Sequence, residues 1–204
     1  MIVKTITPAS FASNCYVVTS GGHSLIVDPS ASTAAILEAL KASRADCVGI
    51  VLTHGHFDHI LSLDVLRDAL PDVPVYIHGA DAELLGNGEK NAFSLFFGQD
   101  RSWRPATHLL ANGDTLALGS EQLKVLSTPG HTAGSICLLG DGLLLTGDTL
   151  FDGSFGRYDL YGGSLSALRA SLERLSSLDP TLTIYPGHGG TATLGAALAA
   201  TGLI

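Results

Sequence analysis

The most informative stretch of the chain is a string of seven residues in which histidine and aspartate alternate with other types. It runs from residue 53 to 59, reads THGHFDH, and so carries His54, His56, Asp58 and His59. Imidazole and carboxylate groups together are ligands that zinc, iron and manganese take in proteins. The string therefore predicts chemistry at bound metal ions, with zinc as the expected metal and iron or manganese as alternatives.

Three further motifs combine glycine with a side chain of the same kinds. The tripeptide PGH occurs at residues 129–131 and 186–188, and residues 146–149 read TGDT, which supplies His131, His188 and Asp148. A lone His-x-His arises often by chance, but the longer string together with these motifs does not. The remaining three histidines, His23, His78 and His108, have no such context and are interpreted as surface or structural residues.

The spacing suggests how these side chains divide. Residues two apart at the end of a strand point to the same side, so His54 and His56 can hold one cation, whereas Asp58 and His59 can point at a second position nearby. Five histidines and two aspartates are too many for one tetrahedral ion. We therefore expect two ions with an open position for a shared water. The first would be held by His54, His56 and His131 and the second by Asp58, His59 and His188, with Asp148 able to bridge them.

A purely structural metal site is the main alternative, but such sites are usually closed and rich in cysteine. The three cysteines, Cys15, Cys47 and Cys137, all lie outside these motifs and within apolar runs. They are interpreted as buried thiols of a protein in a reducing compartment. The ligand types thus favour a catalytic site.

Short apolar runs precede each of these motifs and predict the strands that position them. His54 follows the run 48–52, and His131, Asp148 and His188 follow 122–127, 143–145 and 182–185. Residues 79–113 are less regular and are interpreted as an insertion with one or two short helices, with a lid over a pocket as an alternative. The other predicted strands are 2–6, 14–19, 24–27, 73–77, 115–118 and 135–139, and the predicted helices are 34–42, 60–70 and 164–178.

Composition excludes several classes of function. The 204 residues predict one domain spanning 1–204, and 46% hydrophobic content favours a compact globule. Only 11 Lys and Arg stand against 19 Asp and Glu, so a nucleic-acid partner is not expected. No apolar run reaches the roughly 18 residues of a membrane span, and no leader segment is recognisable. We expect a cytoplasmic protein with a small-molecule substrate; the oligomeric state stays open, a homodimer included.

Taken together, the H-x-H-x-D-H string, the two PGH motifs and the GD motif resemble those of the metallo-β-lactamase fold superfamily. The resemblance extends from Asn14-Cys15-Tyr16 to Gly189 and implies an α+β fold. This fold is an αββα sandwich of two mixed β-sheets packed face to face, with helices outside and the metals at one edge. It also implies the seven ligands named above, with Asp148 as the bridge, and gives Asp58 and Asp148 catalytic roles.

Within that superfamily the chain looks most similar to small glyoxalase II-like hydrolases. The stretch from Phe155 to Gly163 is similar to the G-R-x-D-x-x-G-G of that group, which implies that Arg157 contacts the substrate. The implied activity is that of a dinuclear hydrolase whose bridging hydroxide attacks a thioester such as a hydroxyacylglutathione. Persulfide dioxygenases, which hold one iron, share the same motifs and remain an alternative, and lactone hydrolysis is a further one. The resemblance does not include the C-terminal helical domain of full-length glyoxalase II enzymes, so the thiol carrier stays open.

Overall fold

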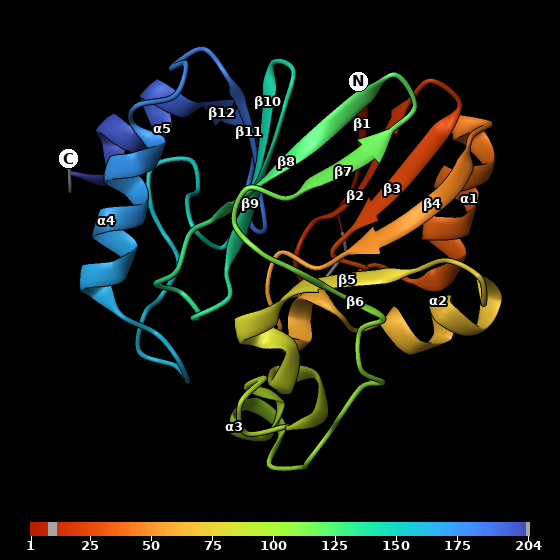
Figure 1. Cartoon of the computed structure of the whole chain (residues 1–204). Helices are drawn as coiled ribbons and strands as arrows, with labels where there is room; N and C mark the ends of the chain where they lie inside the picture. Colours follow the sequence, from red (N-terminus) through yellow and green to blue (C-terminus); the bar gives the residue numbers. More distant parts are fainter. Residues whose placement is uncertain (8–11, 203–204) are drawn as a thin grey trace.

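The computed structural model describes residues 1–7 and 12–202, and within them the strands form two six-stranded sheets. Each sheet is made from one contiguous half of the chain (Figure 1). In the first sheet the order is β1-β2-β3-β4-β5-β6, antiparallel as far as β3 and parallel from β3 to β6. These strands are β1 (Ile2–Ile6), β2 (Cys15–Ser20), β3 (His23–Val27), β4 (Asp46–Val51), β5 (Val75–His78) and β6 (His108–Leu110).

The second sheet has the order β12-β11-β10-β9-β8-β7. Its neighbours pair antiparallel except β10 and β11, which are parallel. Both sheets are therefore mixed, as the resemblance implied. The strands are β7 (Thr115–Leu118), β8 (Glu121–Ser127), β9 (Ile136–Gly140), β10 (Leu143–Gly147), β11 (Thr183–Pro186) and β12 (Ala192–Thr193).

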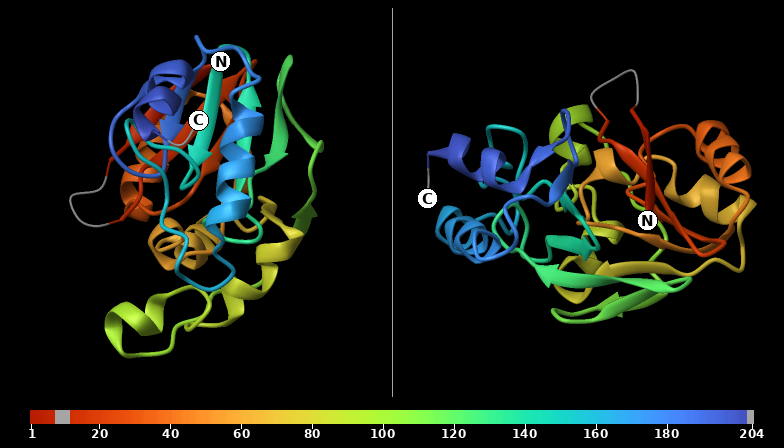
Figure 2. Two further views of the ribbon diagram at one scale, coloured as in Figure 1. Left: turned by 90° about the vertical axis from the view of Figure 1, so that its left-hand side faces the viewer. Right: turned by 90° about the horizontal axis from the view of Figure 1, so that it is seen from above.

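Helices cover the outer face of each sheet, which completes the expected αββα sandwich (Figures 1 and 2). Ser32 and Ser164 cap two of the long helices by accepting hydrogen bonds from Ala35 N and Ala167 N, which fixes where these helices begin. The helices on the first sheet are α1 (Thr33–Ser43) and α2 (Leu63–Ala69), and those on the second are α4 (Leu165–Leu175) and α5 (Leu194–Thr201).

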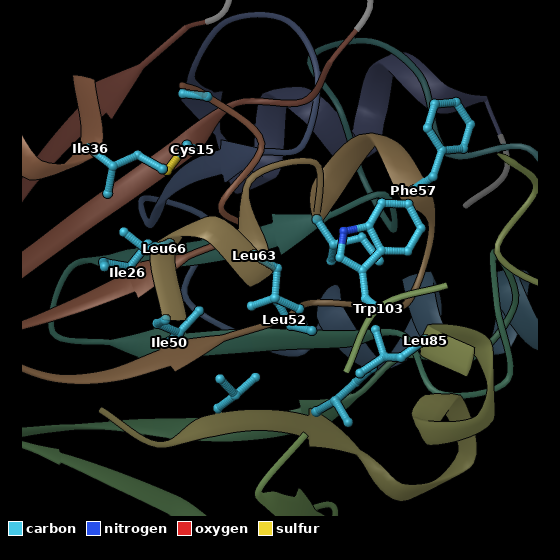
Figure 3. Packing of buried hydrophobic residues seen from close by; sticks show 14 of the residues in the cluster. Cys15, Ile26, Ile36, Ile50, Leu52, Phe57, Leu63, Leu66, Leu85 and Trp103 are labelled. Carbon is cyan, nitrogen blue, oxygen red and sulfur yellow. The ribbon is translucent and has the colours of Figure 1, made fainter. Parts of the chain in front are cut away.

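The alternation of side chains along each strand produces three layers of core. In β2, Val18 points between the sheets, whereas its neighbour Val17 points outward toward the helices. Leu63 and Leu66 of α2 pack on this outer face with no exposed surface (Figure 3). Full burial of one such leucine stabilises the fold by about 1.5–3 kcal/mol. The sandwich is thus held from both sides of each sheet, which gives rigid strand ends on which a site can be built.

Several elements differ from the sequence expectation. The helix predicted from residue 60 begins at Leu63, because the single-turn helix η1 (Phe57–His59) precedes it. Residues 79–113 are not irregular throughout, because their last part forms β6 on the edge of the first sheet. The first part of residues 79–113 holds η2 (Gly79–Gly86) and the projecting helix α3 (Phe93–Phe97) (Figure 2). Strand β12 and helix α5 were not predicted. In the described part of the chain, no helix has the length and apolar character required to cross a membrane.

Candidate metal centre

All seven sequence-predicted ligands lie at the edge where the two sheets meet. The first sheet contributes His54 and His56 after β4, followed by Asp58 and His59 in η1. The second sheet contributes His131 after β8, Asp148 at the end of β10, and His188 after β11. Strand ends hold these side chains because the buried strands fix the backbone up to the point where the loops begin.

Three buried imidazoles form the first group. His54 Nε2 lies 3.2 Å from His131 Nε2, and His56 Nδ1 lies 2.8 Å from the same nitrogen. The three rings stand nearly perpendicular to one another, and one nitrogen of each lies within 4.8 Å of the others. These three residues could hold one metal ion.

Asp58, His59 and His188 form the second group. His188 Nε2 lies 3.1 Å from Asp58 Oδ2, and the Asp58 side chain keeps 18% of its surface exposed. The His59 ring is completely buried beneath them. This group could hold a second ion at a position closer to solvent.

Asp148 lies between the two groups and contacts both. Its Oδ1 is 3.1 Å from His59 Nε2, whereas its Oδ2 is 3.6 Å from His131 Nε2 and 3.6 Å from His188 Nε2. A carboxylate in this place can share its two oxygens between two cations. The geometry thus fits the bridging position proposed for Asp148.

Hydrogen bonds of the outward-facing Nδ1 atoms determine which ring nitrogen of each histidine carries a hydrogen. His131 Nδ1 donates to the Arg157 carbonyl oxygen at 2.7 Å, and His59 Nδ1 donates to Asp28 Oδ2 at 2.8 Å. His54 Nδ1 lies 3.2 Å from Thr53 Oγ1, whose own hydrogen goes to Asp28 Oδ2, so the ring nitrogen is the donor. Nε2 of His54 and Nε2 of His131 are then left as acceptors that face the centre, whereas the carboxylates around His59 raise its pKa and favour a second proton on that ring when no cation is bound.

This donor set fits a bound cation. The inward nitrogens of His54 and His131 face each other with no hydrogen to share, an arrangement that a cation between them would stabilise. His59 Nε2 and Asp148 Oδ1 are both buried and lie 3.1 Å apart, and neither has a hydrogen-bond partner of ordinary angular geometry among the described residues. Buried polar atoms rarely lack a partner in folded proteins unless an ion or ordered water satisfies them.

The two groups differ in their electrostatics. Burial and the neighbouring His131 lower the pKa of His56 to about 3, so this ring is neutral. Burial also lowers the pKa of His59, but the surrounding carboxylates outweigh it and hold that pKa well above its ordinary value. Burial works to raise the pKa of Asp148, but the nearby imidazoles, His59 foremost, keep it below its ordinary value. The first group therefore contains the neutral imidazole of His56, whereas carboxylates surround the imidazole of His59 in the second.

Two buried carboxylates that sequence reasoning missed hold the loops of the site. Asp28 accepts hydrogen bonds from Thr53 N at 2.8 Å, from Thr53 Oγ1 and from the His59 ring. It adopts φ +52°, a backbone conformation that favours glycine, so its side chain is placed at some conformational cost. The sequence showed it only as the residue that ends a strand before Pro29.

Asp81 of η2 is the corresponding residue for the first group. It is completely buried and accepts hydrogen bonds from Gly55 N at 3.0 Å, Thr132 Oγ1 at 2.7 Å and Gly134 N at 2.6 Å. Burial raises the pKa of Asp81, although these three donors partly offset it. Asp81 thus joins the loop that carries His54 and His56 to the loop that carries His131. No sequence pattern marked it.

The glycine of the second PGH motif is required by close packing. A Cβ at Gly187 would collide with Asp148 Oδ1 and lie 2.6 Å from His59 Cε1. The same holds at Gly156, where a Cβ would collide with the Asp148 carbonyl oxygen. Both positions let the backbone pass directly beside the proposed bridging residue.

A cavity of about 560 Å³ opens above the centre. Its polar floor contains Asp58, Asp148 and the imidazoles of three proposed ligands, and its remaining lining is mostly apolar. Arg157 reaches the cavity, but its guanidinium is also paired with Asp159 at 2.7 and 2.8 Å. The resemblance implied a substrate contact for the Arg157 side chain; the structure adds a role for its carbonyl group, which orients His131.

The two-sheet sandwich with a histidine- and aspartate-rich edge defines a class of metal-dependent proteins. The family model described as "Metallo-beta-lactamase superfamily" matches residues 10–188, and the chain belongs to this superfamily. Among its relatives, a Bacillus subtilis protein called "Probable metallo-hydrolase YqgX" is 35% identical over 179 residues, which cover 86% of this chain and 84% of that protein.

Two solved structures are similar over nearly the whole chain. The BLEG-1 B3 metallo-beta-lactamase is 33% identical with a TM-score of 0.89, and the match covers 97% of each chain. A structure of TTHA1623 in a di-iron-bound form is 32% identical with a TM-score of 0.84, and the match covers 100% of each chain. These similarities and the His and Asp cluster support a metal-dependent hydrolase.

Proposed function

We propose that the protein is a hydrolase that holds two divalent metal ions, zinc or iron, and cleaves a thioester. The observation that carries this proposal is the convergence of seven ligand-type side chains from both sheets at one site, five of which line one cavity. The name of the Bacillus subtilis relative supports hydrolysis, and the di-iron form of TTHA1623 supports two ions of which either can be iron.

The seven residues would form two metal positions. One ion would be held by the first group, the other by the second, and Asp148 would contact both. When bound, the two ions would supply Lewis acidity and lower the pKa of water from 15.7 toward about 7. The protein would contribute a fixed ligand geometry and a cavity whose apolar walls exclude bulk water.

Asp58 is placed to handle the proton of the reaction. Its carboxylate lies on the cavity floor, is partly exposed, and its pKa is held below the ordinary value despite burial, His59 being the main cause. The attacking water forms a C–O bond to the acyl carbon and passes a proton to Asp58, and the C–S bond then breaks. The sulfur leaves as a thiolate and takes that proton. The acid product releases its own proton to solvent.

A thioester suits this site because its leaving group needs little help. Thiols have pKa values near about 8.5, so a thiolate departs without a dedicated general acid. Arg157 at the cavity wall remains the proposed contact for a polar part of the substrate. A hydroxyacylglutathione is the compound class that the sequence resemblance suggests, and lactone hydrolysis is the next candidate within the same chemistry.

The test combines metal analysis with a thiol-release assay on protein purified without chelator. We expect about two ions per chain and thiol release that stops on chelation and returns with zinc or iron. His23→Ala, which removes an exposed histidine outside both groups, serves as a matched control and should change neither measurement. A single iron together with oxygen uptake on a glutathione persulfide would replace the proposal with a dioxygenase. Lactone turnover without thioester turnover would change the substrate class.

A further inference from the structure

One wall of the cavity is built from aromatic side chains that the proposed reaction does not use. Phe96 and Phe97 of α3 line the cavity although they keep 56% and 44% of their surface exposed. Large apolar side chains gathered at a concave site mark a surface that binds an apolar ligand group. Leu95 on the same helix is exposed as well, but it is not among the residues that line the cavity.

This wall is supported from below by the protein core. Phe57 is buried and its ring centre lies 5.4 Å from that of Phe96. It also contacts Phe93 edge to face at 5.6 Å, and Phe93 in turn contacts Trp103. Since Phe57 immediately precedes Asp58, the aromatic cluster and the cavity floor share one piece of backbone. The wall is therefore held at a fixed place relative to the reacting groups.

Two further apolar side chains line the cavity. They are Phe151 and Leu160, and the Phe151 ring centre lies 6.0 Å from that of His188. Among the described residues that line the cavity, Arg157 is the only lysine or arginine, and it is paired with Asp159. The cavity thus offers much apolar surface and little positive charge for a substrate that carries several carboxylates.

We propose that the apolar lining formed by Phe96, Phe97, Phe151 and Leu160 binds the acyl group of the substrate, and that the preferred acyl group is bulky and apolar. This inference rests on the proposed thioester hydrolysis and names its substrate class: thioesters of medium-chain or aryl-substituted acids. Each methylene that contacts this lining should raise kcat/KM about fourfold until the cavity is filled.

The test uses metal-loaded protein and a series of N-acetylcysteamine thioesters from acetyl to octanoyl, together with phenylacetyl. We expect kcat/KM to rise along the series. Phe96→Ala should lower the octanoyl-to-acetyl ratio about tenfold, and Phe96→Leu should restore part of it, because an apolar surface returns. Leu95→Ala is the matched control on the same helix and should leave the ratio unchanged.

Calorimetric binding of the product carboxylates, from acetate to octanoate, gives a readout that does not depend on turnover. An affinity that rises with chain length, and rises less in Phe96→Ala, supports the apolar subsite. If the same protein cleaves no thioester, that result counts against the proposed reaction and leaves the subsite standing. A flat series in both measurements overturns the subsite, while hydrolysis of the acetyl thioester would keep the proposed function intact.

Discussion

The two proposed ligand groups lie side by side but are built differently. The first consists of three buried imidazoles, whereas the second contains the carboxylate of Asp58 and includes His188, whose side chain is 34% exposed. A buried carboxylate also supports each group: Asp81 joins the loops of the first, and Asp28 orients His59 in the second while it also holds Thr53. The comparison suggests that the buried first group retains its metal ion, whereas the second group exchanges its ion more readily and contacts the substrate.

The largest effect is expected at Asp148, the residue that contacts both groups. Asp148→Asn removes the charge that faces three histidines, so both positions weaken together. We expect metal content to fall to about one ion per chain or fewer, and the rate to fall about a thousandfold. Metal analysis and the thioester assay measure this. Two retained ions with full activity would show that Asp148 does not connect the groups.

Asp81→Asn tests the support of the first group. All three of its partners are donors, and an amide would place an NH₂ group against one of them. We expect the free energy of unfolding of the metal-free protein to fall by about 2–3 kcal/mol. Urea denaturation measures it, and Asp72→Asn at an exposed turn is the matched control. An unchanged midpoint would mean that Asp81 does not hold the two loops.

Asp28→Asn tests the support of the second group. The ring of His59 would lose its charged acceptor, which orients the ring and raises its basicity. We expect the affinity of one of the two ions to fall about 10- to 100-fold, while the other is retained. A metal titration of the chelated protein separates the two affinities. Equal weakening of both ions would show that Asp28 serves the whole centre rather than one side.

The smallest effect concerns the rate at which the ions leave. Because Asp58 and His188 of the second group keep exposed surface and the first group is buried, a soluble chelator should remove one ion about tenfold faster than the other. The His188→Ala variant should lack the faster phase and keep the slower one. Stopped-flow chelation measures both. If the chelator removes both ions from the native protein in a single phase, the two positions do not differ in how readily they release their ions.

The parts of the molecule that could be predicted from sequence are those with local signals. The spacing within residues 53–59 and the apolar runs before each motif pointed to the seven side chains that the structure brings together. Asp81 carried no such signal because its partners Gly55 and Gly134 are distant in sequence. Strands β6 and β12 are too short to show an alternation, and their pairing depends on neighbouring strands.

The division of the chain into two contiguous sheets has a consequence for the order of assembly. Every proposed ligand group draws on both halves, and His188 comes from the last strands of the second sheet. During synthesis the N-terminal half emerges with four of the seven side chains in place but with no complete group. Capture of the ions by a complete group can therefore occur only after the second half has folded against the first. Once bound, the ions would act as cross-links between the two halves of the folded chain.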